Sequence, residues 1–307
     1  MYDLIGDIHG HATELTQLLQ KLGYTQNKNG VYAHPTRKVI FAGDFIDRGN
    51  EVREVLQIAK GMTDAGTALA VMGNHEYNIL CYHTKNEQGE YLRLHTDKNK
   101  KQQQATEDAF KDYREEWQMY LDWMMELPIW LDLGDLRIIH ACWQPTFIEQ
   151  IQSAIAGNRL TPSFLQASAV EGNWEYEAIE ILLKGLEQAL PDGEFFYDKD
   201  GHQRTAMRIQ WWKAPEGLTR SEYGLGIPSS DVPIPLAWST NFHYSPTDIP
   251  VFIGHYWLRA EQPSLQSPSV CCLDYSVAKA GQLVGYRWQE GTPISNDNFV
   301  WVKGIKQ

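Results

Sequence analysis

Short apolar runs of strand character recur along the chain, and a cluster of polar residues follows each of them. There are five such runs, and each is followed by a polar residue of interest. They are residues 2–5 before Asp7, 39–42 before Asp44, 68–72 before Asn74, 136–139 before His140 and 251–253 before His255. Such runs are typical of strands in an open α/β sheet. Because the carboxyl ends of these strands meet at one crevice, the polar residues are expected to converge there.

Segments with the periodicity of amphipathic helices follow the first two runs. Each has four apolar residues at the i, i+3, i+4, i+7 spacing of one buried helical face. They are Leu15, Leu18, Leu19 and Leu22 after the first run, and Val52, Val55, Leu56 and Ala59 after the second. The alternation of strand and helix predicts an α/β fold.

Two longer segments interrupt this alternation. The first, residues 82–127, contains a polar tract at 98–104, either a solvated loop or a helix start, and then a helical pattern. That pattern consists of Phe110, Tyr113, Trp117, Tyr120, Leu121 and Met124. The second segment, residues 145–235, contains the helical pattern Ile179, Leu182, Leu183, Leu186 and Leu190, and then a stretch rich in Gly, Pro and Ser. We therefore expect residues 1–307 to form a single domain with insertions at about 82–127 and 145–235.

Composition restricts the class of protein. A chain of 307 residues can bury a large core, and its net charge of -12 argues against nonspecific binding to nucleic acid or acidic membranes. Four cysteines, two of them adjacent, do not make a disulfide framework. The first polar cluster lies so close to Met1 that no cleaved signal is expected, and no apolar run approaches a membrane span. These features predict a cytoplasmic protein with neither nucleic acid nor membrane as partner.

The polar clusters form five short motifs in one order. They are Gly6-Asp7-Ile8-His9-Gly10, Gly43-Asp44-Phe45-Ile46-Asp47-Arg48-Gly49, Gly73-Asn74-His75-Glu76, His140-Ala141 and Gly254-His255. A single motif is explained equally well by turns and helix caps, but turn chemistry does not explain four well-placed histidines. Mixed imidazole and oxygen donors suit Mn, Fe, Zn, Co or Ni better than Mg or Ca. The set predicts two adjacent divalent metals with an acid–base pair beside them, and hence a metal-assisted hydrolase.

The ordered motifs resemble those of the calcineurin-like metallophosphoesterases. The resemblance is to the phosphoprotein-phosphatase branch, in which bacterial Ser/Thr phosphatases and diadenosine tetraphosphatases are found. It extends to residues 123–128, Cys272-Leu273-Asp274 and 281–287, and it leaves out residues about 145–235. The resemblance implies an α/β fold of the four-layer αββα metallophosphoesterase type, here with helical insertions.

The resemblance also implies a ligand set. Asp7, His9 and Asp44 would hold one metal ion, and Asp44, Asn74, His140 and His255 would hold the other, with Asp44 as the bridge. A carboxylate can bridge ions roughly 3.5–4 Å apart, and a water between two such ions ionises near neutral pH and attacks phosphorus directly. Two divalent cations are therefore expected as cofactors, with manganese as the first candidate and iron, zinc, cobalt and nickel as alternatives.

The remaining motif residues would act on the substrate. In the family a histidine matching His75 protonates the leaving oxygen, and a carboxylate matching Asp47 orients it. Arg48 offers a planar fork for phosphate oxygens, with a surface salt bridge as the alternative. Asn74 is also expected beside the substrate. Arg208 is the candidate for a second phosphate arginine, although an ordinary exposed arginine is an equal alternative.

The sequence leaves the substrate open among phosphoserine or phosphothreonine proteins, dinucleoside polyphosphates and small monoesters. The Asp47 and His75 motifs favour protein phosphatases, whereas Cys272-Leu273-Asp274 and residues 286–288 are closer to bacterial tetraphosphatases. Cys142 stands where the family usually has glycine, and Tyr256-Trp257 stand where Thr-Pro is common in the family. The mouth of the crevice is therefore expected to be bulkier than in a protein phosphatase. Cys142 is read as a small buried residue in preference to a redox thiol. A non-catalytic scaffold is disfavoured because every ligand is present.

Overall fold

The computed structural model describes residues 1–197, 203–229, 231–235, 244–245 and 248–305. The strands are β1 (Tyr2–Ile5), β2 (Thr25–Gln26), β3 (Tyr32–Ala33), β4 (Lys38–Phe41), β5 (Ala68–Ala70), β6 (Trp130–Asp132), β7 (Arg137–Ile139), β8 (Glu187–Ala189), β9 (Phe196–Tyr197), β10 (Gln203–Arg204), β11 (Ala206–Ile209), β12 (Gly224–Leu225), β13 (Val251–Ile253), β14 (Val270–Cys272), β15 (Asp274–Tyr275), β16 (Gln282–Trp288) and β17 (Phe299–Lys303). The α-helices are α1 (Ala12–Leu22), α2 (Val52–Asp64), α3 (Asn74–His83), α4 (Asp97–Phe110), α5 (Arg114–Met125), α6 (Pro145–Ile155), α7 (Pro162–Ser168), α8 (Trp174–Lys184) and α9 (Arg220–Tyr223). Short 3-10 helices are η2 (Val277–Lys279) and η3 (Asn296–Asn298).

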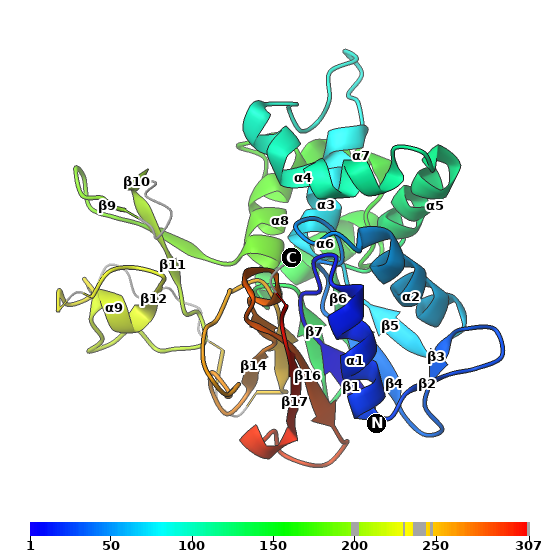
Figure 1. The fold of residues 1–307 in the computed structure, drawn as a ribbon. Coiled ribbons are helices and arrows are strands. Elements are labelled where there is room, and N and C mark those ends of the chain that lie inside the picture. Colours follow the sequence, from blue (N-terminus) through cyan, green and yellow to red (C-terminus); the bar gives the residue numbers. More distant parts are fainter. Residues whose placement is uncertain (198–202, 230, 236–243, 246–247, 306–307) are drawn as a thin grey trace.

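Two sheets form the centre of the molecule (Figure 1). The six-stranded sheet has the order β15-β16-β1-β4-β5, with β17 also paired to β16, and the four-stranded sheet has the order β14-β13-β7-β6. A buried cluster joins their inner faces, with Leu4 and Ile40 from one sheet and Ile138, Phe252 and Cys271 from the other. Apolar burial between the two sheets therefore fixes their face-to-face packing.

Helices α1 and α2 form an outer layer on the six-stranded sheet (Figure 1). The apolar stripe predicted for α1 is fully buried, and the helix ends at Gly23, whose φ of 94° is favourable for glycine. At the other sheet, α8 contacts the chain leaving β7, where the N–H groups of Ala141 and Cys142 donate to the Leu182 carbonyl. Two central sheets with helices outside them confirm the predicted αββα fold class.

The structure corrects two helix predictions in the insertions. The pattern from Phe110 to Met124 is divided between α4 and α5, and Tyr113 is a 45% exposed residue at the start of α5. The polar tract at 98–104 lies within α4. In the second segment α8 ends at Lys184, because Gly185 adopts φ 85° and ψ 168°, which no helix continues. Leu186 and Leu190 therefore lie outside the helix and pack on another core.

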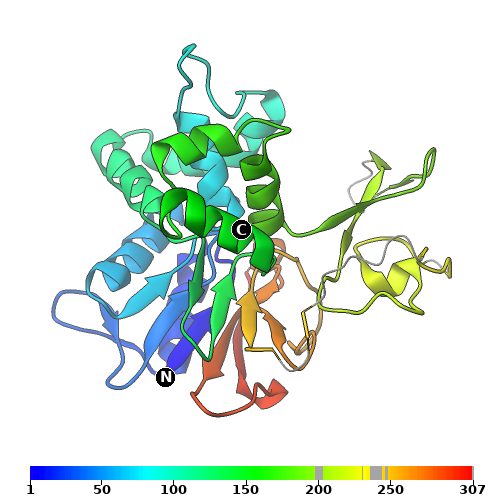
Figure 2. The ribbon, with the colours of Figure 1, turned by 180° about the vertical axis from the view of Figure 1, so that it is seen from behind.

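That other core belongs to a small β-lobe, which we define as the described residues of 187–225. It contains the three-stranded sheet β12-β11-β8 and the hairpin of β9 and β10. Met207, Ile209 and Tyr223 form its own apolar cluster. Figures 1 and 2 show the β-lobe standing out from the body on the side away from α1 and α2. No helix in the described part of the chain has the length and apolar character to cross a membrane.

Candidate metal centre

The five polar motifs meet at one end of the two sheets. Strands β1, β4 and β5 run parallel to one another, and β13 runs parallel to β7, so the chain leaves each of them toward the same edge. The metal-ligand candidates that follow these strands are all buried, at 7% exposure or less: Asp7, His9, Asp44, Asn74, His140 and His255. The predicted convergence is present in the structure.

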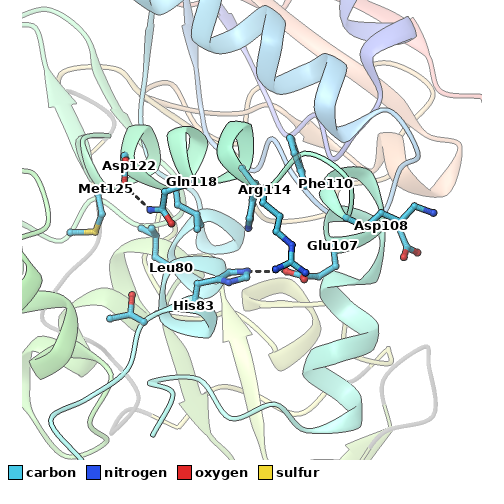
Figure 3. A pocket seen from close by; sticks show the side chains of 13 residues that line it. Leu80, His83, Glu107, Asp108, Phe110, Arg114, Gln118, Asp122 and Met125 are labelled. Atoms are coloured by element: carbon cyan, nitrogen blue, oxygen red, sulfur yellow. Dashed lines mark hydrogen bonds and ion pairs between the residues drawn. The ribbon is translucent and has the colours of Figure 1, made fainter. Parts of the chain in front are cut away.

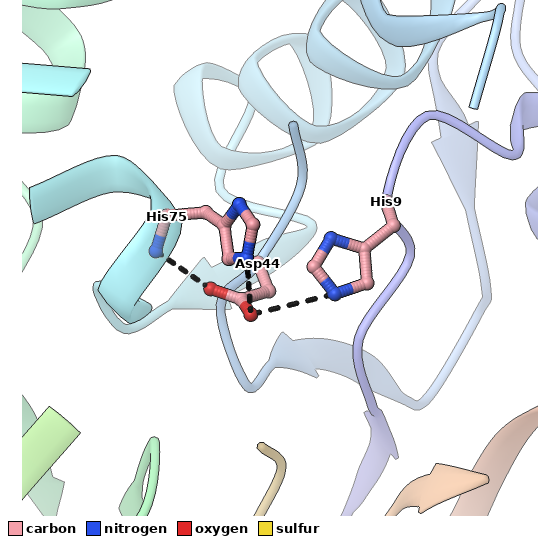
Figure 4. Close-up of side chains that lie close together, drawn as sticks. All are labelled: His9, Asp44 and His75. Carbon is pink, nitrogen blue, oxygen red and sulfur yellow. Dashed lines mark hydrogen bonds and ion pairs between the residues drawn. The ribbon is translucent and has the colours of Figure 1, made fainter. Parts of the chain in front are cut away.

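Asp44 lies at the centre of the site. Its Oδ2 is 3.5 Å from His9 Nε2 and 3.4 Å from His140 Nε2, and His75 Nε2 lies 4.0 Å away. Figure 4 shows the His9 and His75 rings directed at the Asp44 carboxylate from two sides. A single carboxylate is thus shared by imidazoles from different motifs, the placement that a bridging ligand requires.

The other side of the centre is built around the Asn74 amide. Asn74 Oδ1 lies 3.1 Å from His140 Nε2 and 2.7 Å from His255 Nδ1. Two groups of donor atoms lie mutually within 4.8 Å: His9, Asp44 and His75 form one, and Asp44, His140 and His255 form the other. Asp7 belongs to neither group, and its carboxylate accepts the His255 backbone N–H, at 3.0 Å from Oδ2.

The donor set fits a divalent cation. His9 Nδ1 lies 3.0 Å from the Ile46 carbonyl and His140 Nδ1 lies 2.7 Å from the Ala42 carbonyl, so each Nδ1–H donates and each Nε2, directed toward Asp44, is the atom that would bind a metal ion. His9 Nε2 is buried without a hydrogen-bond partner. Because burial lowers the pKa of His9, its Nε2 keeps a lone pair that faces the Asp44 carboxylate, and a cation between the two groups would remove their repulsion.

Electrostatics in the protein alone lead to the same conclusion. Burial and then repulsion by Asp274 raise the pKa of Asp7 well above its usual value. Burial lowers the pKa of His140, but the Asp44 carboxylate outweighs burial and raises it to about 10. A divalent cation would stabilise the Asp7 carboxylate and would take the place of the proton on His140.

Close backbone approach shapes the site. Asp44 and His255 adopt left-handed φ values of 54° and 70°, which direct their side chains inward. Gly254 has no room for a side chain, since a Cβ there would lie 2.0 Å from Asp7 Oδ1 and 3.4 Å from His140 Cε1. The glycine therefore lets two ligand motifs approach each other.

We expect Gly254→Ala to weaken metal binding, because the added methyl group must displace the Asp7 carboxylate. The dissociation constant for Mn²⁺ should rise by roughly 10- to 100-fold, as for other disturbances of ligand orientation. Calorimetric titration of the metal-free chain measures it. Gly157→Ala is the matched control, since a Cβ there meets nothing within 4 Å. Equal Mn²⁺ affinity in the two variants would show that the close approach has no role in metal binding.

His75 and Asp47 form the second part of the site. His75 Nδ1 lies 2.5 Å from Asp47 Oδ2, so the Asp47 carboxylate holds one ring nitrogen and Nε2 is directed toward Asp44. Burial lowers the pKa of His75, but the carboxylates of Asp44 and Asp47 outweigh it and raise the pKa above its usual value. The arrangement favours an imidazolium whose Nε2–H faces the metal centre.

Two buried carboxylates support the ligands, and sequence reasoning assigned them no role. Glu76 accepts the N–H groups of Asp44, Phe45 and Gly73 at 2.8–2.9 Å, so it holds the loop that carries Asp44. Asp274 accepts the Trp257 N–H at 2.6 Å and the Ser276 N–H at 2.9 Å. Both residues stand in quoted motifs, and the available signal for Glu76 was its place three residues after Gly73, from which its side chain reaches back to the Gly73 N–H at the start of the helix.

A cavity of about 760 Å³ opens beside the metal centre, and Arg48 and Arg208 both line it. It lies between the β-lobe and the chain that follows His255, and we call it the cationic cavity because Arg204, Arg259 and Lys279 line it too. The Arg48 guanidinium stacks on the Trp257 ring at 4.1 Å. Tyr256 and Trp257 also line the cavity, so the predicted bulk at the mouth is present.

Cys142 is fully buried and burial raises its pKa well above the usual value, in line with a packing role.

Comparison with known proteins relates the chain to phosphoesterases. Residues 2–142 match the family described as calcineurin-like phosphoesterase. The bis(5'-nucleosyl)-tetraphosphatase PrpE [asymmetrical] of Bacillus subtilis (strain 168) is 49% identical over 75 residues, 24% of this chain and 30% of that protein. The symmetrical bis(5'-nucleosyl)-tetraphosphatase of Hamiltonella defensa is 30% identical over 179 residues, 54% of this chain and 55% of that protein.

A crystal structure provisionally assigned as a diadenosine tetraphosphatase shares the fold. It covers 100% of this chain and 94% of its own, with a TM-score of 0.51 and 16% sequence identity. The chain spans about a third to about half of the length of the curated relatives described above. The resemblance to the calcineurin-like phosphoesterases is confirmed by these matches.

Proposed function

We propose, on the premise that residues 2–142 match the calcineurin-like phosphoesterases, that the protein hydrolyses a phosphate ester or anhydride with two divalent metal ions. The observation that carries the proposal is the position of Asp44, whose Oδ2 lies 3.4–3.5 Å from His140 and His9. The His75–Asp47 pair stands beside it with a proton available. A metal-ligand set and an acid at one buried point are what phosphoryl transfer to water requires.

Each residue has a distinct task in the proposed reaction. His9, Asp44, Asn74, His140 and His255 would hold the ions, together with Asp7, whose carboxylate accepts the His255 N–H. When bound, such ions lower the pKa of water and neutralise charge on phosphoryl oxygens. His75 would deliver the Nε2 proton to the leaving oxygen while Asp47 holds Nδ1. Arg48, fixed on Trp257, would bind phosphate through its guanidinium fork.

The cationic cavity favours a substrate with several phosphates. Among the residues that the structure describes, five cationic side chains line it, Arg48, Arg204, Arg208, Arg259 and Lys279, with one carboxylate, Glu187. A monoester phosphate needs only part of this charge, whereas a polyphosphate chain could extend along it. Phe196, Tyr256 and Trp257 add aromatic faces on which a base could stack. We therefore propose a dinucleoside polyphosphate as the first substrate class.

A phosphoserine or phosphothreonine protein is the second candidate, and the His75–Asp47 pair favours it. Serine and threonine alkoxides are poor leaving groups and need a proton in the transition state. The phosphate released from an anhydride is a better leaving group and needs less protonation. The cavity and the acid pair thus favour different substrates of one hydrolytic site.

A substrate panel with the Mn²⁺-loaded chain tests both proposals. We expect diadenosine tetraphosphate to be cleaved with a higher kcat/KM than a phosphothreonine peptide, AMP or p-nitrophenyl phosphate. A higher kcat/KM for the phosphopeptide would establish the second candidate instead. A chain that binds two metal ions and cleaves none of the four would contradict the phosphoesterase proposal.

The metal and the location are further parts of the proposal. Manganese is the first candidate, since imidazole and carboxylate donors are mixed in the site. We propose a cytoplasmic location because all four cysteines are free thiols, as in reducing compartments. Metal analysis of the chain purified without added metal tests the first point.

We expect Arg48→Ala to weaken competitive inhibition by inorganic phosphate by roughly tenfold or more, because a charge-assisted bidentate contact is lost. Arg48→Lys should recover only part of it, since an ammonium group cannot reproduce the fork. Inhibition constants and metal content measure the effect, with Arg53→Ala as the control because Arg53 instead pairs with Glu116.

Arg208→Ala should act in the same direction as Arg48→Ala. Unchanged inhibition in Arg208→Ala would place the second arm of the clamp at Arg204 or Arg259.

A further inference from the structure

Helix α4 of the first insertion reaches the catalytic acid pair through Thr106. Thr106 is fully buried, 59 positions along the chain from Asp47. Its hydroxyl accepts the Asp47 backbone N–H at 3.0 Å and donates to Asp47 Oδ1 at 2.5 Å. One side chain thus fixes both the backbone and the carboxylate of Asp47.

The two oxygens of Asp47 have separate partners. Oδ1 accepts from Thr106, and Oδ2 lies 2.5 Å from His75 Nδ1. Asp47 also has a left-handed φ of 68°, a conformation that costs an aspartate energy and persists only where its surroundings hold it. The contact with Thr106 supplies such a hold, so the direction of Oδ2 toward His75 depends on α4.

Helix α4 is in turn fixed to α3, the helix that carries His75. Arg93 donates to Asn78 of α3 at 3.0 Å and to Gln102 of α4 at 3.1 Å. On the other side of Thr106, His83 Nε2 at the end of α3 lies 2.8 Å from Glu107 Oε1 of α4. Figure 3 shows this ion pair within a cavity between α3, α4 and α5. Helix α4, which carries Thr106, and helix α3, which carries His75, are therefore held together by side-chain contacts on both sides of Thr106.

We infer that Thr106 is a positioning residue for the general acid His75, so that the first insertion completes the acid half of the site. The inference rests on the proposed phosphoesterase function. Thr106 O–H directs Asp47, Asp47 orients the His75 ring, and His75 Nε2 then faces the leaving oxygen. Thr106 hydrogen-bonds to the backbone N–H and the carboxylate of Asp47, so the role that we assign to it acts through the Asp47–His75 pair.

The test compares phenyl phosphate with p-nitrophenyl phosphate, which differ in leaving group and little in shape. In the Mn²⁺-loaded chain, Thr106→Val should lower kcat on phenyl phosphate by roughly 10- to 100-fold and leave KM unchanged, because a hydrogen bond to a charged group is lost. The loss on p-nitrophenyl phosphate should be several times smaller, since its leaving group needs less protonation. Thr106→Ser should restore most of kcat. Thr106→Ala removes the same hydroxyl with a smaller side chain. It should show the same fall in kcat and the same dependence on leaving group, and it replaces Thr106→Val if valine disturbs the packing.

A matched control separates positioning from helix stability. Phe110 is buried on α4 and packs against Trp117 and Tyr120, so Phe110→Leu should lower Tm and leave the ratio of the two kcat values unchanged. Equal losses on both substrates in Thr106→Val, no loss, or failure of serine to rescue would each overturn the inference.

A spectroscopic measurement judges Thr106 independently of turnover. In the Zn²⁺-loaded chain the His75 Nδ1–H should give a downfield proton resonance, identified by its loss in His75→Asn. The resonance should move or broaden in Thr106→Val and persist in Thr106→Ser, and an unchanged resonance in Thr106→Val would overturn the inference. Absence of hydrolysis by the unmodified chain would instead contradict the proposed function, with the resonance still deciding the role of Thr106.

Discussion

Replacing Asp44 by asparagine is expected to remove bound metal and turnover together. The amide is neutral, so it cannot balance two divalent ions at the point where the Nε2 atoms of His9 and His140 lie 3.5 and 3.4 Å from Asp44 Oδ2. Loss of several kcal/mol of charge stabilisation should lower kcat/KM by roughly 10³-fold or more. Metal content per chain and kinetics at saturating Mn²⁺ measure the two effects.

The outcome for Asp44 has a matched control on the surface. Asp64 pairs with Lys60 across one helical turn on the surface of α2, so Asp64→Asn should keep both metal and activity. Two bound metals with near-normal turnover in Asp44→Asn would end the two-metal assignment. Loss of one metal with partial turnover would mean that Asp44 serves a single ion.

His75→Asn is expected to lower kcat by roughly 10²–10⁴-fold on esters with poor leaving groups, while metal content stays constant. Asparagine cannot donate the proton that His75 Nε2 carries toward the Asp44 side of the site. The substitution also removes the imidazole whose Nδ1 lies 2.5 Å from Asp47 Oδ2, so the oriented acid pair is lost. Steady-state kinetics with phenyl phosphate, together with metal analysis, give the measurement.

The dependence on leaving group identifies the role of His75. p-Nitrophenolate leaves without much protonation, so the fall in kcat on p-nitrophenyl phosphate should be much smaller than the fall on phenyl phosphate. Equal losses on the two esters, or lost metal, would show that His75 binds phosphate or an ion instead. His34→Asn is the control, since His34 hydrogen-bonds to Thr36 and lies outside the groups of metal-ligand atoms.

The apolar pattern predicted the core elements well because their burial is periodic. All five strands before the motifs are present, and β1 and β13 have the predicted bounds. The patterns in the insertions predicted less. Phe110 and Trp117 keep helical spacing across the break between α4 and α5, so periodicity alone could not reveal it. Leu186 and Leu190 extend the α8 pattern, but the conformation of Gly185 ends the helix before them.

The candidate site shows the same division. The motifs predicted which side chains gather, and Asp44, His9, His140, Asn74, His255 and the His75–Asp47 pair do lie together. Arg48 and Arg208 line one cavity, as a phosphate clamp would need. Asp7 is buried beside them and its carboxylate accepts the His255 N–H, so its place in the ligand set stays a prediction. The metal and catalytic roles themselves stay predictions.

By itself the sequence determined where the motif-bearing strands lie along the chain, which polar residues follow them and which donor types a metal centre could use. These follow from local rules, in which apolar spacing selects strand or helix and residue chemistry selects the ligand. Only the tertiary structure decided that Thr106 holds Asp47, that Glu76 fixes the Asp44 loop and that the β-lobe forms one wall of the cationic cavity. The physical reason is that a hydrogen bond acts over about 3 Å, and residues far apart in the chain come within that distance only when the packing of whole elements places them there.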